Sequence, residues 1–288
     1  MPEATTTGPT IGSAHERRSP RAVACGRRRA AWGAALLHIA GADPRMRREA
    51  GRDETWMVVT GSPAPSVNGV FCLARVRRLT RSNSWPTGGE DGGAVAGPVS
   101  WSVQVRSHPT EAIVRTAATH GLTAQSWRPF MVRDLEAAPQ SAPFDSPLRM
   151  RAVDGSEADL YAATLGAGFQ APKEIFTPLF TAAVLDAPGI TAYLGEIDGI
   201  PVATGMGILL DGHIGVFNIS TAAAHRKRGY GALITEHVVR QGHHQGRAPR
   251  PARQRHGGVH VRVARLHPRR TLDVPHRTLT DGRRIPAT

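Results

Sequence analysis

A short basic turn carries the clearest chemical potential in this chain; it comprises Arg226, Lys227, Arg228, Gly229, Tyr230 and Gly231. Gly229 and Gly231 lack a Cβ atom, so the backbone can turn sharply there and its N–H groups can approach an oxygen-rich ligand closely. The three cationic side chains that precede Gly229 add positive charge at the same point. These residue types in this order predict a binding site for an anion.

The residues after the turn predict an amphipathic helix. A helix that begins at the turn directs its free N–H groups and the positive end of its dipole at the ligand. We therefore expect a pyrophosphate to be held at the helix N-terminus. The face that packs on the core follows the i, i+3, i+4, i+7, i+8 spacing and consists of Tyr230, Leu233, Ile234, His237 and Val238.

Two hairpins lead into this turn. Asp198-Gly199 and Asp211-Gly212 each separate two apolar runs. Asp-Gly is among the strongest short hairpin signals, because both central residues of a type I′ turn need positive φ. The expected result is a three-stranded antiparallel meander whose last strand ends at the turn. Its strands are predicted at 190–197, 200–210 and 213–220.

The order strand, R-x-x-G-x-G turn, helix resembles the acetyl-coenzyme A signature of the GNAT (GCN5-related) N-acetyltransferases, and Arg226, Gly229 and Gly231 carry the match. The meander precedes the turn in the same order in that family. The resemblance implies an α/β (α+β) fold, with a mixed, largely antiparallel sheet flanked by helices. It also implies an N-acetyltransferase that uses acetyl-CoA as cosubstrate and a small-molecule or protein amine as acceptor.

The resemblance further assigns positions along the cofactor. In GNAT proteins the last strand of the meander bulges open, and its free backbone groups hold the pantetheine and the thioester carbonyl. By position these residues are Ile219, Ser220 and Thr221. A general base must deprotonate the ammonium of the acceptor. Glu196, which alternates with apolar neighbours on a central strand, is the candidate; the alternative is an ordinary strand carboxylate.

Metal and disulfide chemistry are not expected. Cys25 and Cys72 have no metal-ligand spacing and form no disulfide framework. The histidines after residue 240 have no cysteine or carboxylate beside them at ligand spacing. The sequence also has no apolar run of about 18 residues, which a membrane-spanning helix needs. We therefore expect a cytoplasmic protein.

Composition divides the chain into five parts. Residues 51–136 follow a strand, helix, strand order and resemble a reduced, cofactor-free GNAT copy, with an unrelated α+β domain as the alternative. The full division is a disordered basic segment (1–50), the GNAT-like unit (51–136), a proline-containing linker (137–147), the GNAT core (148–244) and an irregular basic tail (245–288).

Charge is concentrated at the two ends. The chain has a net charge of +13, and residues 1–50 hold nine arginines against four acids, while residues 240–288 hold twelve against two. A nucleic-acid arm is the less favoured reading, because no aromatic or glycine pattern accompanies this charge. Homodimerisation is left open.

The tail departs from the GNAT pattern. That family supplies a further strand, a helix and a final strand here, and the helix contributes a tyrosine that protonates the leaving thiolate; no tyrosine follows Tyr230. One explanation for the missing helix is a shifted reading frame. Synonymous codons for residues 261–267 can be chosen so that reading one nucleotide later gives Tyr-Glu-Ser-Leu-Gly-Phe, which is close to the helix of the family. The other explanation is a genuine disordered tail. The alternative function is therefore a catalytically impaired protein that binds coenzyme A.

Overall fold

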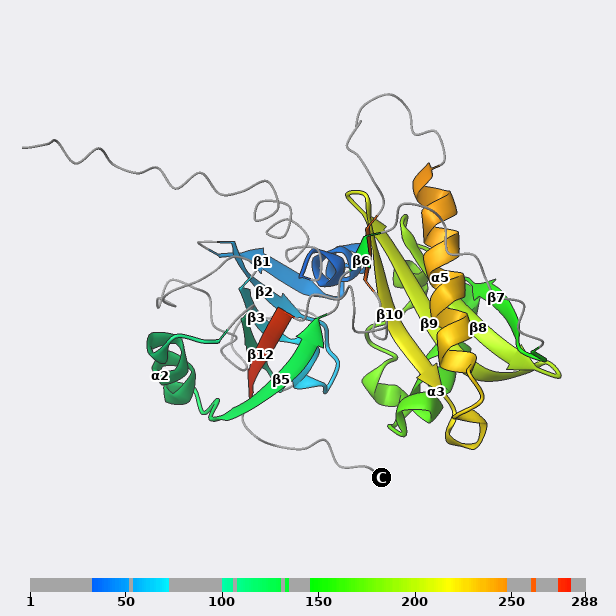
Figure 1. Cartoon of the computed structure of the whole chain (residues 1–288). Coiled ribbons are helices and arrows are strands. Elements are labelled where there is room, and N and C mark those ends of the chain that lie inside the picture. The colour runs from blue at the N-terminus through cyan, green and yellow to red at the C-terminus, as the bar shows by residue number, and fades with distance from the viewer. Residues whose placement is uncertain are drawn as a thin grey trace, which may run out of the picture.

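The described strands form two six-stranded sheets, and helices pack against each (Figure 1). One sheet belongs to the N-terminal unit and the other to the C-terminal unit. The computed structural model describes residues 33–51, 54–72, 100–105, 108–130, 133–134, 146–247, 260–262 and 274–280.

The C-terminal sheet contains the expected meander. Asp198 (φ 51°) and Gly199 (φ 78°) form the first turn, and Asp211 (φ 48°) and Gly212 (φ 73°) form the second, so both hairpins have the positive φ values that Asp-Gly predicts. The strand order is β6-β11-β10-β9-β8-β7. The strands are β6 (Arg133–Asp134), β7 (Arg149–Val153), β8 (Ile190–Ile197), β9 (Ile200–Leu210), β10 (His213–Thr221) and β11 (His260–Arg262).

Helices cover both faces of this sheet (Figure 1). On one face, α5 (Tyr230–Arg247) packs Ile234 and Val238 against Tyr193 and Ala203. On the other face lies α3 (Ala158–Phe169), whose Tyr161 and Leu165 are fully buried. Between α3 and β8 the chain forms a 3-10 turn, η3 (Lys173–Ile175), and a short helix, α4 (Ala182–Leu185).

The N-terminal unit has the predicted strand, helix, strand order, with one strand added from the tail. Its sheet order is β1-β2-β3-β4-β12-β5, and its helix α2 (Glu111–Thr119) packs Ile113 and Ala117 into a core with Val103. The Thr110 side chain caps α2 by accepting from the Ile113 amide. The strands are β1 (Arg47–Ala50), β2 (Thr55–Val59), β3 (Gly69–Cys72), β4 (Ser102–Val105), β5 (Ala124–Phe130) and β12 (Val274–Thr280).

The structure corrects two expectations about the ends of the chain. Part of the segment expected to be disordered (1–50) is a helix over 33–42 followed by β1, and residues 1–32 lie outside the described residues. This helix is ordered because Ala35, Leu36, Ile39 and Ala40 share one apolar face, which is buried in a core formed by residues of both units. The arginine-rich composition hid that periodicity.

The second correction concerns the tail expected to be irregular (245–288). Its residues 260–262 form β11, which pairs in parallel with β10, and its residues 274–280 form β12, which lies antiparallel between β4 and β5. Main-chain pairing needs no apolar period, so composition alone did not reveal either strand. Helix α5 also continues to Arg247.

A buried carboxylate joins the two units. The Asp43 side chain is 1% exposed, accepts from Arg45 Nη2 at 2.7 Å and accepts from the Thr181 hydroxyl, at the start of α4, at 2.6 Å. These hydrogen bonds, from Arg45 first, lower the pKa of Asp43 from its ordinary value against the opposing effect of burial. The ionised carboxylate is therefore the form that stabilises the junction.

We expect Asp43→Asn to lower the free energy of unfolding at neutral pH by about 1.5–3 kcal/mol, the range for hydrogen bonds to a charged group. Because the folded-state pKa is depressed, this contribution is present above the ordinary carboxyl range and is lost as pH falls. Urea unfolding of both proteins should show a difference that narrows towards pH 3. Asp159→Asn, which removes an exposed partner of Lys173, is the control and should change stability little. A difference that widened at low pH would contradict this account of Asp43.

Candidate functional site

The basic turn has a backbone geometry that is suited to an anion. It follows a 3-10 turn, η4 (Ala223–His225), and leads directly into α5. Lys227 has φ 62° and Gly229 has φ 80°, so two left-handed residues alternate with right-handed or extended ones. Such an alternation turns successive backbone N–H groups to the same side. Lysine is an unusual residue for this conformation, which points to a backbone geometry imposed by the turn as a whole.

Five consecutive amides in this turn have no acceptor within the part of the chain that the structure describes. They are those of residues 227–231, since the first hydrogen bonds of α5 run from the amides of Ala232 and Leu233 to the Gly229 carbonyl, at 3.0 and 3.1 Å. The turn therefore offers an unbroken row of donors at the positive end of an 18-residue helix. An oxygen-rich anion satisfies donors in this arrangement.

Arg226 has a different position from the one expected for a cofactor contact. All three of its guanidinium nitrogens donate to the protein: Nε to the Thr221 carbonyl (3.1 Å), Nη1 to Gln170 Oε1 (3.0 Å) and Nη2 to the Gly168 carbonyl (2.7 Å). The side chain thus ties the turn to the ends of β10 and α3. Lys227 and Arg228, both exposed, remain as the cations that can face an anion.

Strand β10 opens just before the turn. It pairs with β9 from His213 to Phe217 and again at Ser220 and Thr221, with a register shift between Phe217 and Ser220. Strand β11 accompanies only residues 213–215, so among the described residues no strand lies on that side of residues 216–221. The expected opening is present, although it is centred earlier than expected.

The bulge contains Ile219 and also Asn218, which the sequence reasoning missed. Asn218 has φ 54°, while Ser220 and Thr221 are already paired with Thr204 and Ala203. Asparagine adopts the left-handed conformation more readily than other residues with a side chain. An asparagine in the middle of an apolar strand was therefore the signal that could have located the bulge.

The open strand and the amide turn are contiguous. A Cβ atom on Gly231 would lie 3.8 Å from Thr221 Oγ1 and 4.0 Å from Ile219 Cγ2, so the first turn of α5 faces the end of β10 directly. An extended ligand bound by the turn can therefore continue along the unpaired edge of β10. Together, the turn and the open edge define the candidate site.

Glu196, the expected general base, lies elsewhere. It sits near the end of β8, two strands from β10, which corresponds to roughly 10 Å across the sheet. Its Oε1 accepts from Arg151 Nε at 2.8 Å, and Arg151 also pairs with Glu157 just before α3. The structure does not bring Glu196 together with the amide turn.

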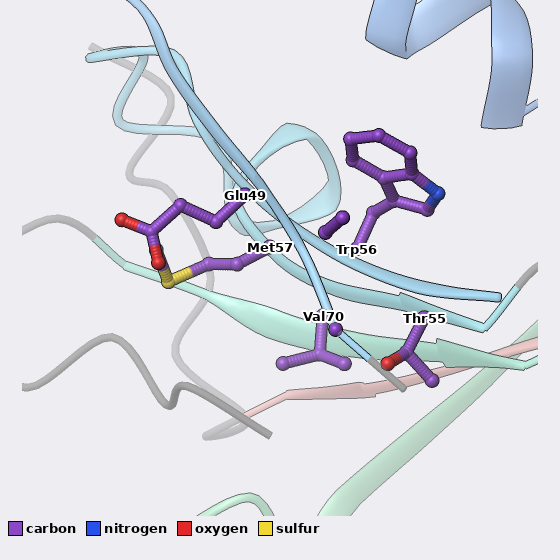
Figure 2. A pocket seen from close by; sticks show the side chains of 7 residues that line it. Glu49, Thr55, Trp56, Met57 and Val70 are labelled. Atoms are coloured by element: carbon purple, nitrogen blue, oxygen red, sulfur yellow. The ribbon is translucent and has the colours of Figure 1, made fainter. Parts of the chain in front are cut away.

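The other polar groups of the molecule do not form a competing site in the residues described. No group of three or more His, Cys, Asp or Glu side chains among them is arranged to hold a metal ion. Burial raises the pKa of the Cys72 thiol to about 12, which leaves it unreactive. A hollow in the N-terminal sheet (Figure 2) contains Glu49, which pairs with Arg47, beside Met57 and Val70. Its carboxylate and apolar lining are unsuited to an anion.

Comparison with solved structures identifies the fold. A GCN5-related N-acetyltransferase from Kribbella flavida aligns over 88% of this chain and 95% of its own, with a TM-score of 0.54 at 15% identity. The chain has the GNAT fold. No protein-family model and no curated protein matches the sequence.

Two further GNAT-type structures match smaller parts. The GCN5-related N-acetyltransferase from Sphaerobacter thermophilus aligns over 62% of this chain and 59% of its own, with a TM-score of 0.40 at 16% identity. A predicted acetyltransferase from Clostridium acetobutylicum, solved with acetyl-CoA, aligns over 34% and 75%, with a TM-score of 0.30 at 12% identity. None of the helices in the described part of this GNAT-fold chain is long and apolar enough to cross a bilayer.

Arg226→Leu tests the positioning role of that side chain in the GNAT-fold unit. Three hydrogen bonds between the turn and its neighbours are lost, so the amides of residues 227–231 should sample more conformations. We expect the affinity of the turn for inorganic pyrophosphate to fall about tenfold, or about 1.4 kcal/mol, at both low and high salt. The control is Arg228→Leu, which removes an exposed cation. The loss of affinity in this variant should become smaller at high salt, because salt screens the attraction between Arg228 and the anion. Calorimetry at two ionic strengths separates the two, and identical salt dependences would contradict the assigned role.

Proposed function

We propose that this chain binds the pyrophosphate of coenzyme A in the turn 226–231 and transfers the acyl group of its thioester to an amine. The observation that carries the proposal is the row of five amides, those of residues 227–231, that have no acceptor among the described residues and lie next to the open edge of β10. A pyrophosphate offers the oxygen acceptors that the amides require. The pantetheine arm is a chain of amides, which can hydrogen-bond to an unpaired strand edge as another strand does.

In the proposed reaction, backbone N–H groups and the placement of the two substrates contribute more than individual side chains do. The acceptor amine, once in its neutral form, attacks the thioester carbonyl carbon. The nitrogen of the tetrahedral intermediate then loses one proton, the C–S bond breaks, and the departing thiolate takes up one proton, so that an amide and the free thiol result. Free N–H groups on the edge around Ile219 can stabilise the oxyanion that develops on the carbonyl oxygen. Holding the thioester and the amine side by side supplies most of the remaining rate enhancement. Because Glu196 forms an ion pair with Arg151, we do not assign it the role of general base.

The strand order of the N-terminal sheet supports the prediction that the N-terminal unit binds no cofactor. A cofactor enters a GNAT-like sheet between strands that diverge, and in the N-terminal unit β12 fills the space between β4 and β5. The loop before α2 also lacks a basic glycine turn; it reads Ser107-His108-Pro109-Thr110. One cofactor site per chain is therefore proposed, in the C-terminal unit.

A second candidate function is coenzyme A binding without efficient transfer. It is favoured by the tyrosines: the chain contains three, and Tyr161, Tyr193 and Tyr230 are 0%, 4% and 5% exposed. With all three tyrosines buried, we assign none of them the role of general acid for the leaving thiolate. Loss of a general acid costs about 10²–10⁴-fold in rate.

One experiment distinguishes the two functions. Calorimetry with coenzyme A should show binding under both, whereas acetyl-CoA consumption with a panel of amines should show turnover only under the first. A chain whose tail is read one nucleotide later should recover turnover under the second. Absence of coenzyme A binding would overturn both proposals.

A further inference from the structure

The bulge in β10 is held from beneath by side chains of two other elements. One comes from α3 and one from β9, and both are fully buried: Tyr161 and Thr204 are each 0% exposed. Each contacts a different part of Asn218. We call these two side chains together with Asn218 and Ser220 the bulge clamp.

The first arm joins α3 to the Asn218 side chain. Asn218 Nδ2 donates to the Tyr161 hydroxyl at 3.3 Å, and that hydroxyl donates to the Gly205 carbonyl on β9 at 3.4 Å. A phenol has one proton to donate and can accept as well, so both contacts can be made at once. The Tyr161 ring is itself fixed by an edge-on contact with Phe180, with ring centroids 5.6 Å apart.

The second arm joins β9 to the Asn218 backbone. Thr204 Oγ1 donates to the Asn218 carbonyl at 2.7 Å and lies 2.7 Å from Ser220 Oγ. Because a threonine hydroxyl has a single proton, Ser220 must be the donor in the second contact. The chain of donation therefore runs from Ser220 to Thr204 to Asn218, and it spans both ends of the bulge.

Close packing of α3 completes the clamp. A Cβ atom on Gly168 would overlap the Ser220 side chain, so only glycine allows α3 to approach this closely. The neighbouring Gly168 carbonyl accepts from Arg226. The bulge and the amide turn are thus fastened to the same end of one helix.

The clamp explains how an open strand keeps its shape. Between Phe217 and Ser220 β10 advances three residues while β9, from Met206 to Thr204, advances two, so one extra residue must be accommodated. No described strand supports this stretch on its outer side. Without the clamp, the extra residue could migrate along β10, and a shift of one residue turns each side chain and each N–H group to the opposite side.

We propose that Tyr161 and Thr204 are positioning residues, which set the edge N–H groups of β10 at a fixed place relative to the amide turn. The kinetic part of this proposal rests on the proposed acyl transfer; the conformational part does not. A misplacement of about 1 Å in a reacting group can cost about 10²-fold in rate. The pyrophosphate, bound at the turn, is largely unaffected, so the clamp acts on kcat more than on affinity.

The test uses Tyr161→Phe, Thr204→Val and Asn218→Gly in the full chain. Tyr161→Phe keeps the buried ring, and Asn218→Gly keeps the positive φ without the side chain, so neither opens a large cavity. The control is Thr164→Val, which removes a buried hydroxyl from the same helix; this hydroxyl donates only to the Leu160 carbonyl. Amide hydrogen exchange of residues 217–221 is measured without ligand, and kcat and KM for acetyl-CoA are measured with an amine acceptor.

We expect exchange to accelerate about tenfold or more in the three clamp variants and to stay unchanged in Thr164→Val. The kcat should fall about 10–100-fold while KM for acetyl-CoA stays within about threefold. Wild-type exchange rates in all three variants would overturn the clamp, as would equal acceleration in the control. Faster exchange with unchanged kcat would overturn the positioning role. If the wild-type protein transfers no acyl group, the proposed transfer fails, and the exchange data alone decide on the clamp.

Discussion

Gly231→Asp is expected to abolish coenzyme A binding while leaving the protein folded. Gly231 is the second residue of α5, and the space where its side chain would project is open apart from ordinary contacts with Thr221 and Ile219. An aspartate there places a carboxylate among the five unpaired amides and repels a pyrophosphate. Affinity should fall about 100-fold or more, which is about 2.7 kcal/mol.

The stability of this variant should not fall, because a carboxylate in the first turn interacts favourably with the helix dipole. Gly231→Ala is the matched control: a methyl group fits the same space, so affinity should stay within about fivefold. Calorimetry with coenzyme A and a thermal unfolding curve for each protein make the comparison. Equal affinities for the aspartate and alanine variants would show that the anion does not bind at this turn.

Removal of β12 is expected to disrupt the N-terminal unit. This strand is an interior strand of its sheet, paired with β5 from Val274 to Thr280 and with β4 from Arg277 to Leu279. A chain that ends at residue 273 leaves β4 and β5 with two facing, unpaired edges in the middle of a sheet. Each lost backbone hydrogen bond contributes about 1 kcal/mol net, so Tm should fall by about 10 °C or more, and aggregation should increase.

A chain that ends at Thr280 is the matched control, since it keeps every β12 pairing described, the last of which is made by Thr280 itself. Its unfolding curve should match that of the full chain. Light scattering and circular dichroism on the two shortened proteins provide the measurement. Identical curves for the chain that ends at 273 would mean that β12 adds nothing to the sheet in solution.

The local features of the site could be predicted from the sequence because they depend on short-range backbone chemistry. Asp198-Gly199 and Asp211-Gly212 need positive φ wherever they occur between strands, so they determined the meander before any packing was known. The glycine turn and the period of α5 are equally local, and they predicted the start of the helix at Tyr230, where the proposed anion site lies. The GNAT resemblance followed from their order.

The identity of each contact in the site required the tertiary structure. Arg226 was expected to face the cofactor, but its three donors are taken by residues far away in sequence, Gln170 and Gly168, and by Thr221. Glu196 was a sensible base on a strand, but its partner Arg151 is 45 residues away along the chain. A long-range partner leaves no local pattern, so sequence periodicity cannot reveal it.

The same reason accounts for the ends of the chain. The helix over 33–42 is ordered by a core formed mainly by residues after 150, and β12 is ordered by strands more than 140 residues before it. A segment of biased composition is disordered only when no distant part of the protein is available to bury its apolar residues or to pair with its backbone. The local turns, the strands of the meander and helix α5 were therefore determined by the sequence itself, whereas the bulge clamp, the junction at Asp43 and the added strand were decided by contacts that exist only in the folded protein.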